Sequence, residues 1–334
     1  MMRRIREVQR AAPLLVTTAL FVVTARVVRA QGGSSVQAPS RVAGRVVRPG
    51  GDSVVGVPNA WVTLHRVAPD SAAPMDSTRT SATGAYAFAY RRWGSDEAIY
   101  FASSSHGGVA YFTPPLAQGN VVGDDAEITV FDTTSHAVPI VIRGRHLIVQ
   151  RPGEGGGRIV TEVYEISNDS SVTRVARADD AAGAVWSASI PPGASAPAVG
   201  EGDIPAQAVR FANGRALLFA PLPPGIRQLA FHYTLAAGEF PLKIPVERAT
   251  QVLEVLVEER DARVDGARVR EVAPVAVSGR TLRRFLAQDV PANAVLTVQV
   301  NAPARPYALW FAAGLTLVIG GVMTWALART LRRR

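Results

Sequence analysis

Residues 78–88 read TRTSATGAYAF, and this pattern is the clearest indication of secondary structure in the chain. Gly84 allows a tight turn, after which Tyr86, Phe88 and Tyr90 alternate with alanines. Successive side chains of a strand point to opposite faces of its sheet, so one face of this strand is aromatic and the other is small. The stretch therefore predicts a turn followed by a strand that packs its aromatic face on a core.

The same kind of pattern continues from residue 31 to residue 306, where short apolar or alternating runs are separated by Gly, Pro, Asn, Asp and Ser. Residues 249–260 are compatible with a helix, but their run of Val and Leu favours a buried strand. We expect an all-β protein of tandem Ig-like or transthyretin-like β-sandwich domains with a single C-terminal transmembrane helix. The expected division is a signal peptide (1–30), a flexible leader (31–40), a first sandwich (41–138), one or two further β-sandwich units (139–304), the transmembrane helix (305–328) and a cytoplasmic basic tail (329–334).

The first of these units resembles a known family. Gly44-Arg45-Val46, the turn GVPNA at 56–60 leading into Val62-Thr63-Leu64, and the TxxxxTGxYxF pattern of 78–88 are similar to the carboxypeptidase regulatory-like, or transthyretin-like, β-sandwich. The resemblance covers about the first third of the chain that follows the signal peptide. It implies a non-catalytic accessory module that assists folding, packing or interaction. The zinc peptidase domain that accompanies such modules has no counterpart in the motifs of this sequence.

The C-terminal segment has the character of a membrane span. Residues 307–328 contain 22 residues without a charge, enough to cross the hydrocarbon core. Tyr307 and Trp310 lie near one end and Trp325 near the other, as in an aromatic belt, and four arginines follow in 329–334. The positive-inside rule then places the tail in the cytoplasm. We expect a single-pass protein of the bacterial inner (cytoplasmic) membrane with its β domains in the periplasm.

The N-terminal segment is typical of a secretion signal. A cationic stretch is followed by 15 apolar residues at 11–25, and Val28-Arg29-Ala30 offers a cleavage site before Gln31. Fifteen residues are too few to span a bilayer as a helix. An uncleaved signal anchor is the alternative interpretation.

Small side chains recur every fourth residue along the predicted transmembrane helix. Close packing of helices in lipid requires such a surface, so the pattern indicates docking against another transmembrane helix. The alternative is that small residues are simply common in this chain. The ridge comprises Ala308, Ala312, Thr316, Gly320, Thr324 and Ala328.

Composition excludes several classes of function. The formal charge of +9 comes entirely from the two termini, because residues 31–328 sum to zero, so the body has no net field for nucleic acid. Cysteine is absent, which excludes disulfides, thiolate nucleophiles, and thiolate zinc or iron–sulfur sites.

No residue pattern indicates catalysis. The five histidines are at least ten residues apart and form no metal-binding motif, and Ser195 lies in a Pro-rich loop without a nucleophile-elbow pattern. The acidic pairs 124–125 and 179–180 lack the spacing of a calcium loop. We expect no catalytic residues, no metal and no cofactor, and hence a protein that is not an enzyme.

Aromatic residues are concentrated between positions 86 and 112 of the first unit. Strand alternation places about half of them in the core, and the remainder can form a partner or ligand surface. The candidate surface residues are Trp93, Tyr100, Tyr111 and Phe112.

Two hypotheses follow for function. The first is a structural subunit that docks onto a larger integral-membrane complex (respiratory, photosynthetic or secretory) through its transmembrane helix and β domains. The second is a cell-surface or periplasmic module that binds or senses glycans or peptides.

Overall fold

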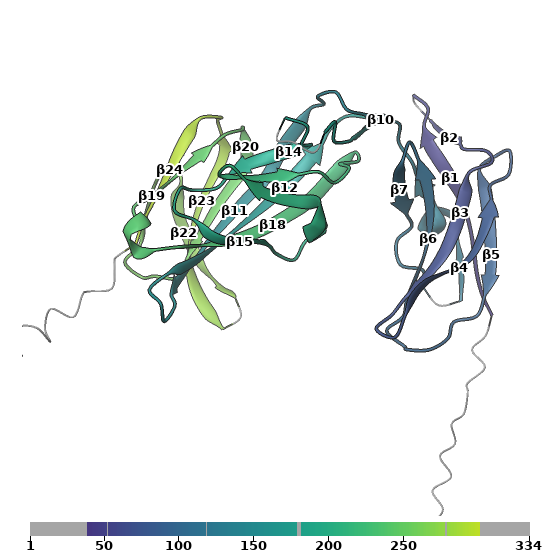
Figure 1. The fold of residues 1–334 in the computed structure, drawn as a ribbon, viewed down its shortest axis with the longest axis horizontal. Helices are drawn as coiled ribbons and strands as arrows, with labels where there is room; N and C mark the ends of the chain where they lie inside the picture. The colour runs from purple at the N-terminus through teal and green to yellow at the C-terminus, as the bar shows by residue number, and fades with distance from the viewer. Residues whose placement is uncertain (1–38, 52, 118, 179–181, 278, 301–334) are drawn as a thin grey trace, which may run out of the picture. The chain divides into compact units, whose positions relative to one another are not determined.

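The computed structural model describes residues 39–300, apart from residues 52, 118, 179–181 and 278. In these residues every regular element is a β-strand except three short 3₁₀ turns, which confirms the all-β prediction. Buried hydrophobic side chains form two separate clusters, one within 42–130 and one within 142–298. We call residues 39–131 the N-terminal unit and residues 140–300 the C-terminal unit (Figure 1).

Several predictions concern residues outside this description. The signal peptide, most of the leader, the transmembrane helix with its small-residue ridge, and the basic tail all belong to 1–38 or 301–334. In the part of the chain that the structure describes, no helix has the length and apolar character needed to cross a membrane.

The N-terminal unit consists of two sheets. In the first sheet, β1 pairs antiparallel with β2 and β5 and parallel with β8 and β9, while the second sheet has the antiparallel order β4-β3-β6-β7. Both sheets contribute side chains to one core. The strands are β1 (Ser40–Pro49), β2 (Val54–Gly56), β3 (Trp61–Val67), β4 (Ala72–Arg79), β5 (Ala85–Tyr90), β6 (Ile99–His106), β7 (Val109–Phe112), β8 (Asn120–Val122) and β9 (Ile128–Thr129), with the 3₁₀ turn η1 (Gly123–Ala126).

Strand β5 has the predicted aromatic face. Tyr86, Phe88 and Tyr90 are buried while the alternating alanines are exposed. Gly84 has φ +80°, and a Cβ there would lie 2.4 Å from the carbonyl oxygen of Val46. The turn therefore requires glycine both for its backbone conformation and for close approach to β1.

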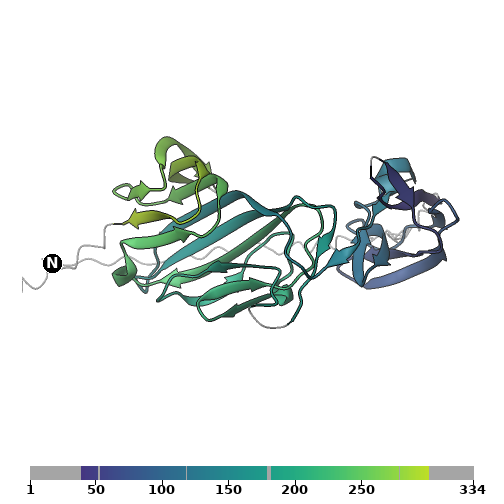
Figure 2. The same ribbon diagram turned by 90° about the horizontal axis from the view of Figure 1, so that it is seen from above.

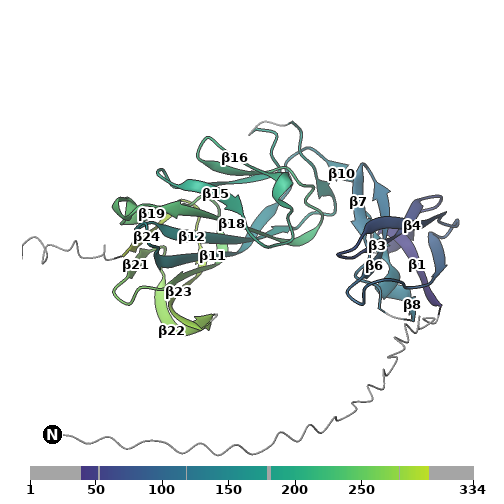
Figure 3. The same cartoon turned by 60° about the horizontal axis from the view of Figure 1, so that its bottom comes forward.

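The C-terminal unit contains a seven-stranded sheet of order β15-β18-β12-β11-β20-β23-β22 and two three-stranded sheets, β14-β17-β16 and β19-β24-β21. The long strands of the large sheet run side by side with a progressive twist (Figures 2 and 3). The strands of these three sheets are β11 (Ile140–Pro152), β12 (Arg158–Asn168), β14 (Trp186–Ser189), β15 (Ser195–Val199), β16 (Val209–Ala212), β17 (Arg215–Leu218), β18 (Gly225–Leu235), β19 (Leu242–Val246), β20 (Thr250–Val257), β21 (Arg263–Gly266), β22 (Arg270–Val277), β23 (Arg280–Val290) and β24 (Ala294–Gln299). The short strands β10 (Thr133–Thr134) and β13 (Thr173–Arg174) pair in parallel, and η2 (Ala206–Ala208) and η3 (Ala237–Glu239) are 3₁₀ turns.

The predicted strand within 249–260 is confirmed as β20, which pairs in parallel with β11 in the middle of the sheet. A hairpin with the glycine-rich tip 153–157 joins β11 to β12.

An ion pair lies inside the core of the C-terminal unit. The Arg145 guanidinium donates to Glu162 Oε2 from Nε (3.1 Å) and Nη2 (2.7 Å). Tyr164 and Tyr233 each donate a hydroxyl hydrogen bond of 2.8 Å to the same carboxylate. Burial raises the pKa of both tyrosines, so their hydroxyls stay protonated and available as donors. Every oxygen of the buried Glu162 carboxylate is thus occupied, which offsets its desolvation.

We expect Glu162→Ala to destabilise the C-terminal unit by about 3–5 kcal/mol, because Arg145 would remain buried without its counter-ion. Urea unfolding of the full chain, monitored by hydrogen exchange over residues 140–299, measures this loss of stability. Glu271→Ala is the matched control, since it removes a half-exposed carboxylate from Arg283 and is expected to cost less than about 1 kcal/mol. Equal losses for the two variants would contradict a special role for the buried pair.

Candidate functional site

The four candidate surface residues divide into two pairs. Trp93 and Phe112 are 52% and 56% exposed, whereas Tyr100 and Tyr111 are 1% and 7% exposed and belong to the core. Tyr100 and Tyr111 therefore form no part of a surface, because the alternation of β6 and β7 turns them inward. Their sequence neighbours point outward instead.

The outward positions of β3, β6 and β7 form a row of rings. His65 stacks on Phe101 with centroids 5.0 Å apart, and Phe101 meets Phe112 edge to face at 5.6 Å. His65 Nε2 also shares a 2.8 Å hydrogen bond with the Ser103 hydroxyl. Burial lowers the pKa of His65 below its ordinary value, so the ring is neutral at pH 7. The row is therefore an uncharged aromatic surface.

Apolar side chains extend the row toward one end of the sheet. Val67, the last residue of β3, is paired with Ile99, the first residue of β6, and both are exposed. We define the aromatic face as His65, Val67, Ile99, Phe101 and Phe112.

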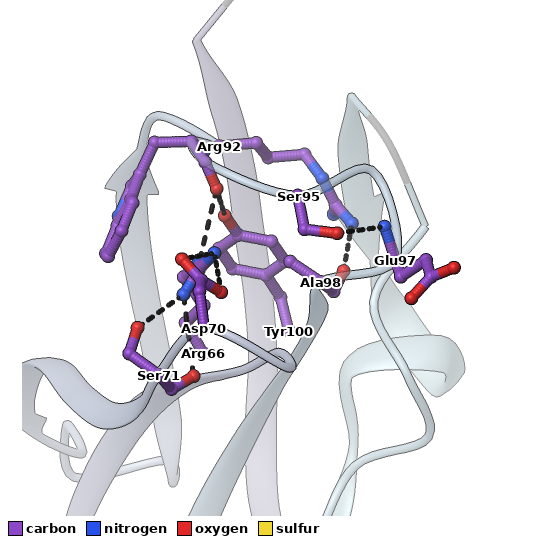
Figure 4. Close-up of polar contacts among 9 residues, drawn as sticks. Arg66, Asp70, Ser71, Arg92, Ser95, Glu97, Ala98 and Tyr100 are labelled. Carbon is purple, nitrogen blue, oxygen red and sulfur yellow. Dashed lines mark hydrogen bonds and ion pairs between the residues drawn. The ribbon is translucent and has the colours of Figure 1, made fainter.

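Trp93 lies in the loop that leads into β6, and Arg66 holds that loop in place. Figure 4 shows Arg66 with its partners Asp70 and Ser71. The Arg66 guanidinium carbon is 3.8 Å from the centroid of the Trp93 ring, and its Nε donates to the Trp93 carbonyl at 3.1 Å. Its other nitrogens donate to both carboxylate oxygens of Asp70 (2.9 and 3.1 Å) and to the hydroxyl of Ser71 (2.7 Å). Hydrogen bonding from Arg66 lowers the pKa of Asp70, so the carboxylate stays ionised opposite the buried guanidinium.

Tyr100 braces the same loop from below. Its hydroxyl accepts a 2.9 Å hydrogen bond from the Trp93 amide and donates to the Trp93 carbonyl at 3.2 Å. Arg92 covers the Tyr100 ring at 4.2 Å and donates to the carbonyl of Ala98 (Figure 4). It also donates to the carbonyl of Leu116. The exposed indole of Trp93 is therefore presented by a backbone fixed on both sides.

The Trp93 loop and the aromatic face meet at one end of the sheet. Residues 68–71 leave β3 after Val67, and residues 91–98 enter β6 before Ile99, so both loops lie where these two paired strands end. The surface that combines them joins the exposed Trp93 ring to the apolar side chains of the aromatic face, and the charged residues Arg91, Asp96 and Glu97 are exposed in the same loop.

The other candidates for chemistry are held by structural contacts. His106 Nε2 is bonded to Asp132 Oδ1 at 2.9 Å, and His146 Nδ1 to Glu254 Oε2 at 2.6 Å. The Ser195 hydroxyl donates to the carbonyl of Thr234 at 3.2 Å, so no general base activates it. Within the described part of the chain, no three His, Cys, Asp or Glu side chains gather as metal ligands do. Asp179 and Asp180 lie outside the described residues.

Sequence reasoning missed His65, Phe101 and Arg66. The signal for His65 was available, because Val62 and Leu64 alternate with Thr63 and His65 and so define the outward face of β3. Arg66 had no signal of its own, since an inward arginine in a strand depends on partners from two loops.

Comparison with known proteins adds no assignment. No family model and no curated protein matches the chain. Among solved structures, native yeast LTA4 hydrolase matches over 50% of this chain with 9% sequence identity and a TM-score of 0.30. This chain covers 30% of that protein. At this TM-score the likeness carries no argument about fold or activity.

We expect Arg66→Met to release the Trp93 loop, because it removes the charged hydrogen bonds while keeping an apolar stem. The expected loss is about 2 kcal/mol for the N-terminal unit, with amide exchange of 91–98 at least about tenfold faster. Hydrogen exchange of the full chain measures both quantities. Arg91→Met, at an exposed neighbouring position, is the control and is expected to stay within about 0.5 kcal/mol of the parent. Unchanged exchange of 91–98 in the Arg66 variant would show that the loop is held by other contacts.

Proposed function

We propose that this protein is a non-catalytic, exported and membrane-anchored structural subunit that docks onto a larger integral-membrane complex through its N-terminal unit. The observation that carries the proposal is the aromatic face, together with the fixed and exposed Trp93 at its end. Apolar patches on a protein surface are typical of interaction sites, and the row of half-buried His65 and Phe101 with the exposed Phe112 forms such a patch.

The composition of this surface favours a protein partner. Interfaces concentrate their binding energy in a few aromatic residues, Trp foremost, surrounded by apolar contacts. Trp93 needs little further ordering on binding, because Arg66 and Tyr100 already fix its backbone. The neutral His65 adds no charge to be desolvated.

The predicted export signal and membrane span indicate the cell compartment in which this docking would occur. We infer that the two units are sandwiches of the transthyretin-like and Ig-like kind, held in the periplasm beside the inner membrane. The resemblance to the carboxypeptidase regulatory-like module agrees with an accessory role. The small-residue ridge from Ala308 to Ala328 would pack against a transmembrane helix of the same partner. That partner would belong to a respiratory, photosynthetic or secretory assembly.

One observation favours the second candidate, a glycan- or peptide-binding module. The rings of Phe101 and Phe112 stand beside the hydroxyls of Ser103 and Thr63 on the same outward face. Aromatic faces with nearby hydrogen-bonding groups can also hold a sugar ring.

A photocrosslinking amino acid at position 112 is expected to react with an integral-membrane protein in native membranes, whereas the same probe at Val122 is not. Val122 is an equally exposed apolar residue of the N-terminal unit on the other sheet. Mass spectrometry of the adducts identifies the partner. Trp93→Ala is expected to weaken capture about 30-fold, as loss of a hot-spot residue of about 2 kcal/mol implies. Absence of position-112 adducts, together with glycan-array binding that Trp93→Ala abolishes, would favour the second candidate and overturn the first.

The membrane contact has its own test. We expect Gly320→Leu to reduce co-purification with the partner in mild detergent, because a bulky side chain in the ridge separates the helices. Leu317→Ile is the control, since Leu317 lies off the ridge. A monodisperse monomer that is indifferent to Gly320→Leu would argue against docking through the helix.

A further inference from the structure

The long edge strands of this protein are interrupted by proline, with one exception. A strand at the edge of a sheet can pair with another chain, and proline, bulges and charged side chains prevent such pairing. Among the described residues, the edge strands of five residues or more are β4, β5, β15, β19 and β22. Strand β5 has no proline and no charge, and its pairing with β1 has no bulge. The other four contain Pro74, Pro197, Pro245 and Pro274 in chain order.

The outer edge of β5 presents main-chain groups that are not used within the sheet. The Val46 amide donates to the Gly84 carbonyl at 2.8 Å, and hydrogen-bonded pairs alternate along an antiparallel ladder. The three aromatic residues of β5 therefore bond to β1, while Ala87 and Ala89 turn their N–H and C=O groups the other way. No described residue bonds to these four groups. Figure 1 shows β5 at the margin of the N-terminal unit.

The sequence of this edge is the same in both directions. Residues 86–90 read YAFAY, so an antiparallel second copy would meet its own sequence, as a twofold interface requires. With Phe88 opposite Phe88 of the second copy, Ala87 lies opposite Ala89, and the four main-chain groups of each copy all find partners. The two tyrosines then lie opposite each other as well, so aromatic side chains meet aromatic side chains across the pair.

The surroundings of the edge leave room for a second copy. The outward side chains of β5 are exposed alanines, which do not project over the edge. On the same face β1 carries Arg41 and Arg45. In the paired arrangement three strand spacings separate β1 from its copy, about 14 Å, which exceeds the screening length of about 8 Å at physiological salt. The main chain of Ala85 is bonded to Ser81, so the pairing would begin at residue 86.

We propose that β5 pairs antiparallel with β5 of a second copy of this chain, joining the first sheets of two N-terminal units into one continuous sheet. An extended segment of another protein could bond to the same edge, but the palindrome matches β5 to itself. The aromatic face stays uncovered, because it lies on the other sheet. The pairing is therefore independent of the docking proposed above.

Disulfide trapping tests the register. The chain has no cysteine, so each substitution reports a single position. Ala87→Cys and Ala89→Cys are co-expressed as full chains with different tags and oxidised in native membranes. Across the proposed pair, positions 87 and 89 have Cα atoms about 5.5 Å apart, within reach of a disulfide, whereas two copies of position 87 are about 7–8 Å apart. We expect at least about tenfold more disulfide from the combination than from either variant alone.

Val122→Cys combined with Ala87→Cys is the matched control. Val122 is exposed on β8, on the opposite side of β1 from β5, and is expected to give no disulfide above background. Disulfide that is equally abundant in the control, or crosslinks from position 87 only to a different protein, would overturn the proposal.

Hydrogen exchange of the full chain in detergent micelles tests the pairing by a second route. In the pair the amides of residues 87 and 89 are hydrogen-bonded, so we expect them to be protected. The double substitution Ala87→Lys/Ala89→Lys places like charges opposite each other on an exposed face, and should speed exchange of both amides at least about tenfold. Mixing with Ala87→Glu/Ala89→Glu is expected to restore protection, which also shows that both variants fold. Unprotected amides at 87 and 89 in the parent chain, or protection that the lysines leave unchanged, would contradict self-pairing.

Discussion

The strict alternation of side chains along β3, β6 and β7 is the constraint on which the N-terminal unit depends. In β6, Tyr100, Ala102 and Ser104 point into the core, and the residues between them point out. A shift of register by one residue would exchange the two sets and place the outward rings in the core. The inward set holds the sheets together, so the outward set is fixed in place by the same packing. The register that buries the core residues is therefore also the one that exposes the rings.

Buried arginines define the geometry at two points of the molecule. Arg66 joins the loop 68–71 to the loop that carries Trp93, and Arg145 joins β11 to Glu162 of β12 and to the Pro245 carbonyl of β19. A guanidinium loses hydration when it is buried, and only a complete set of directed acceptors offsets that cost. Such a group therefore tolerates few arrangements of its neighbours. In both places the arrangement of the neighbouring strands and loops is the one that the arginine requires.

Local patterns in the sequence predicted the local structure well. The alternation of Tyr86, Phe88 and Tyr90 with alanines predicted β5 and its buried face, and the Val and Leu run predicted β20. Residues 99–106, in contrast, read IYFASSSH, where adjacent Tyr100 and Phe101 give no alternation of polar and apolar residues. Their orientation is decided by pairing with β3, in which His65 lies opposite Phe101.

Contacts between distant residues could not be predicted in the same way. The Arg145–Glu162 pair depends on the register of a long hairpin that contains a bulge between Ile142 and Gly144. The Trp93 loop is fixed by Arg66, which lies 27 positions earlier in the sequence on another strand. No local pattern carries such information, because it arises from sheet order and the covering of one sheet by another.

The area of the aromatic face and the adjoining Trp93 determines how strongly they could bind a partner. Trp93, Phe112 and Ile99 are each about half exposed, so covering them would remove about 300 Å² from water and contribute about 7 kcal/mol. Loss of translational and rotational freedom on association costs about 4–15 kcal/mol, so this surface alone supports at most weak binding of a partner that diffuses freely. A partner held in the same membrane is already confined, and a linked contact can raise the effective concentration to about the millimolar range. The face is therefore suited to a partner that the predicted transmembrane helix has already brought near, and docking by helix and sheet would reinforce each other.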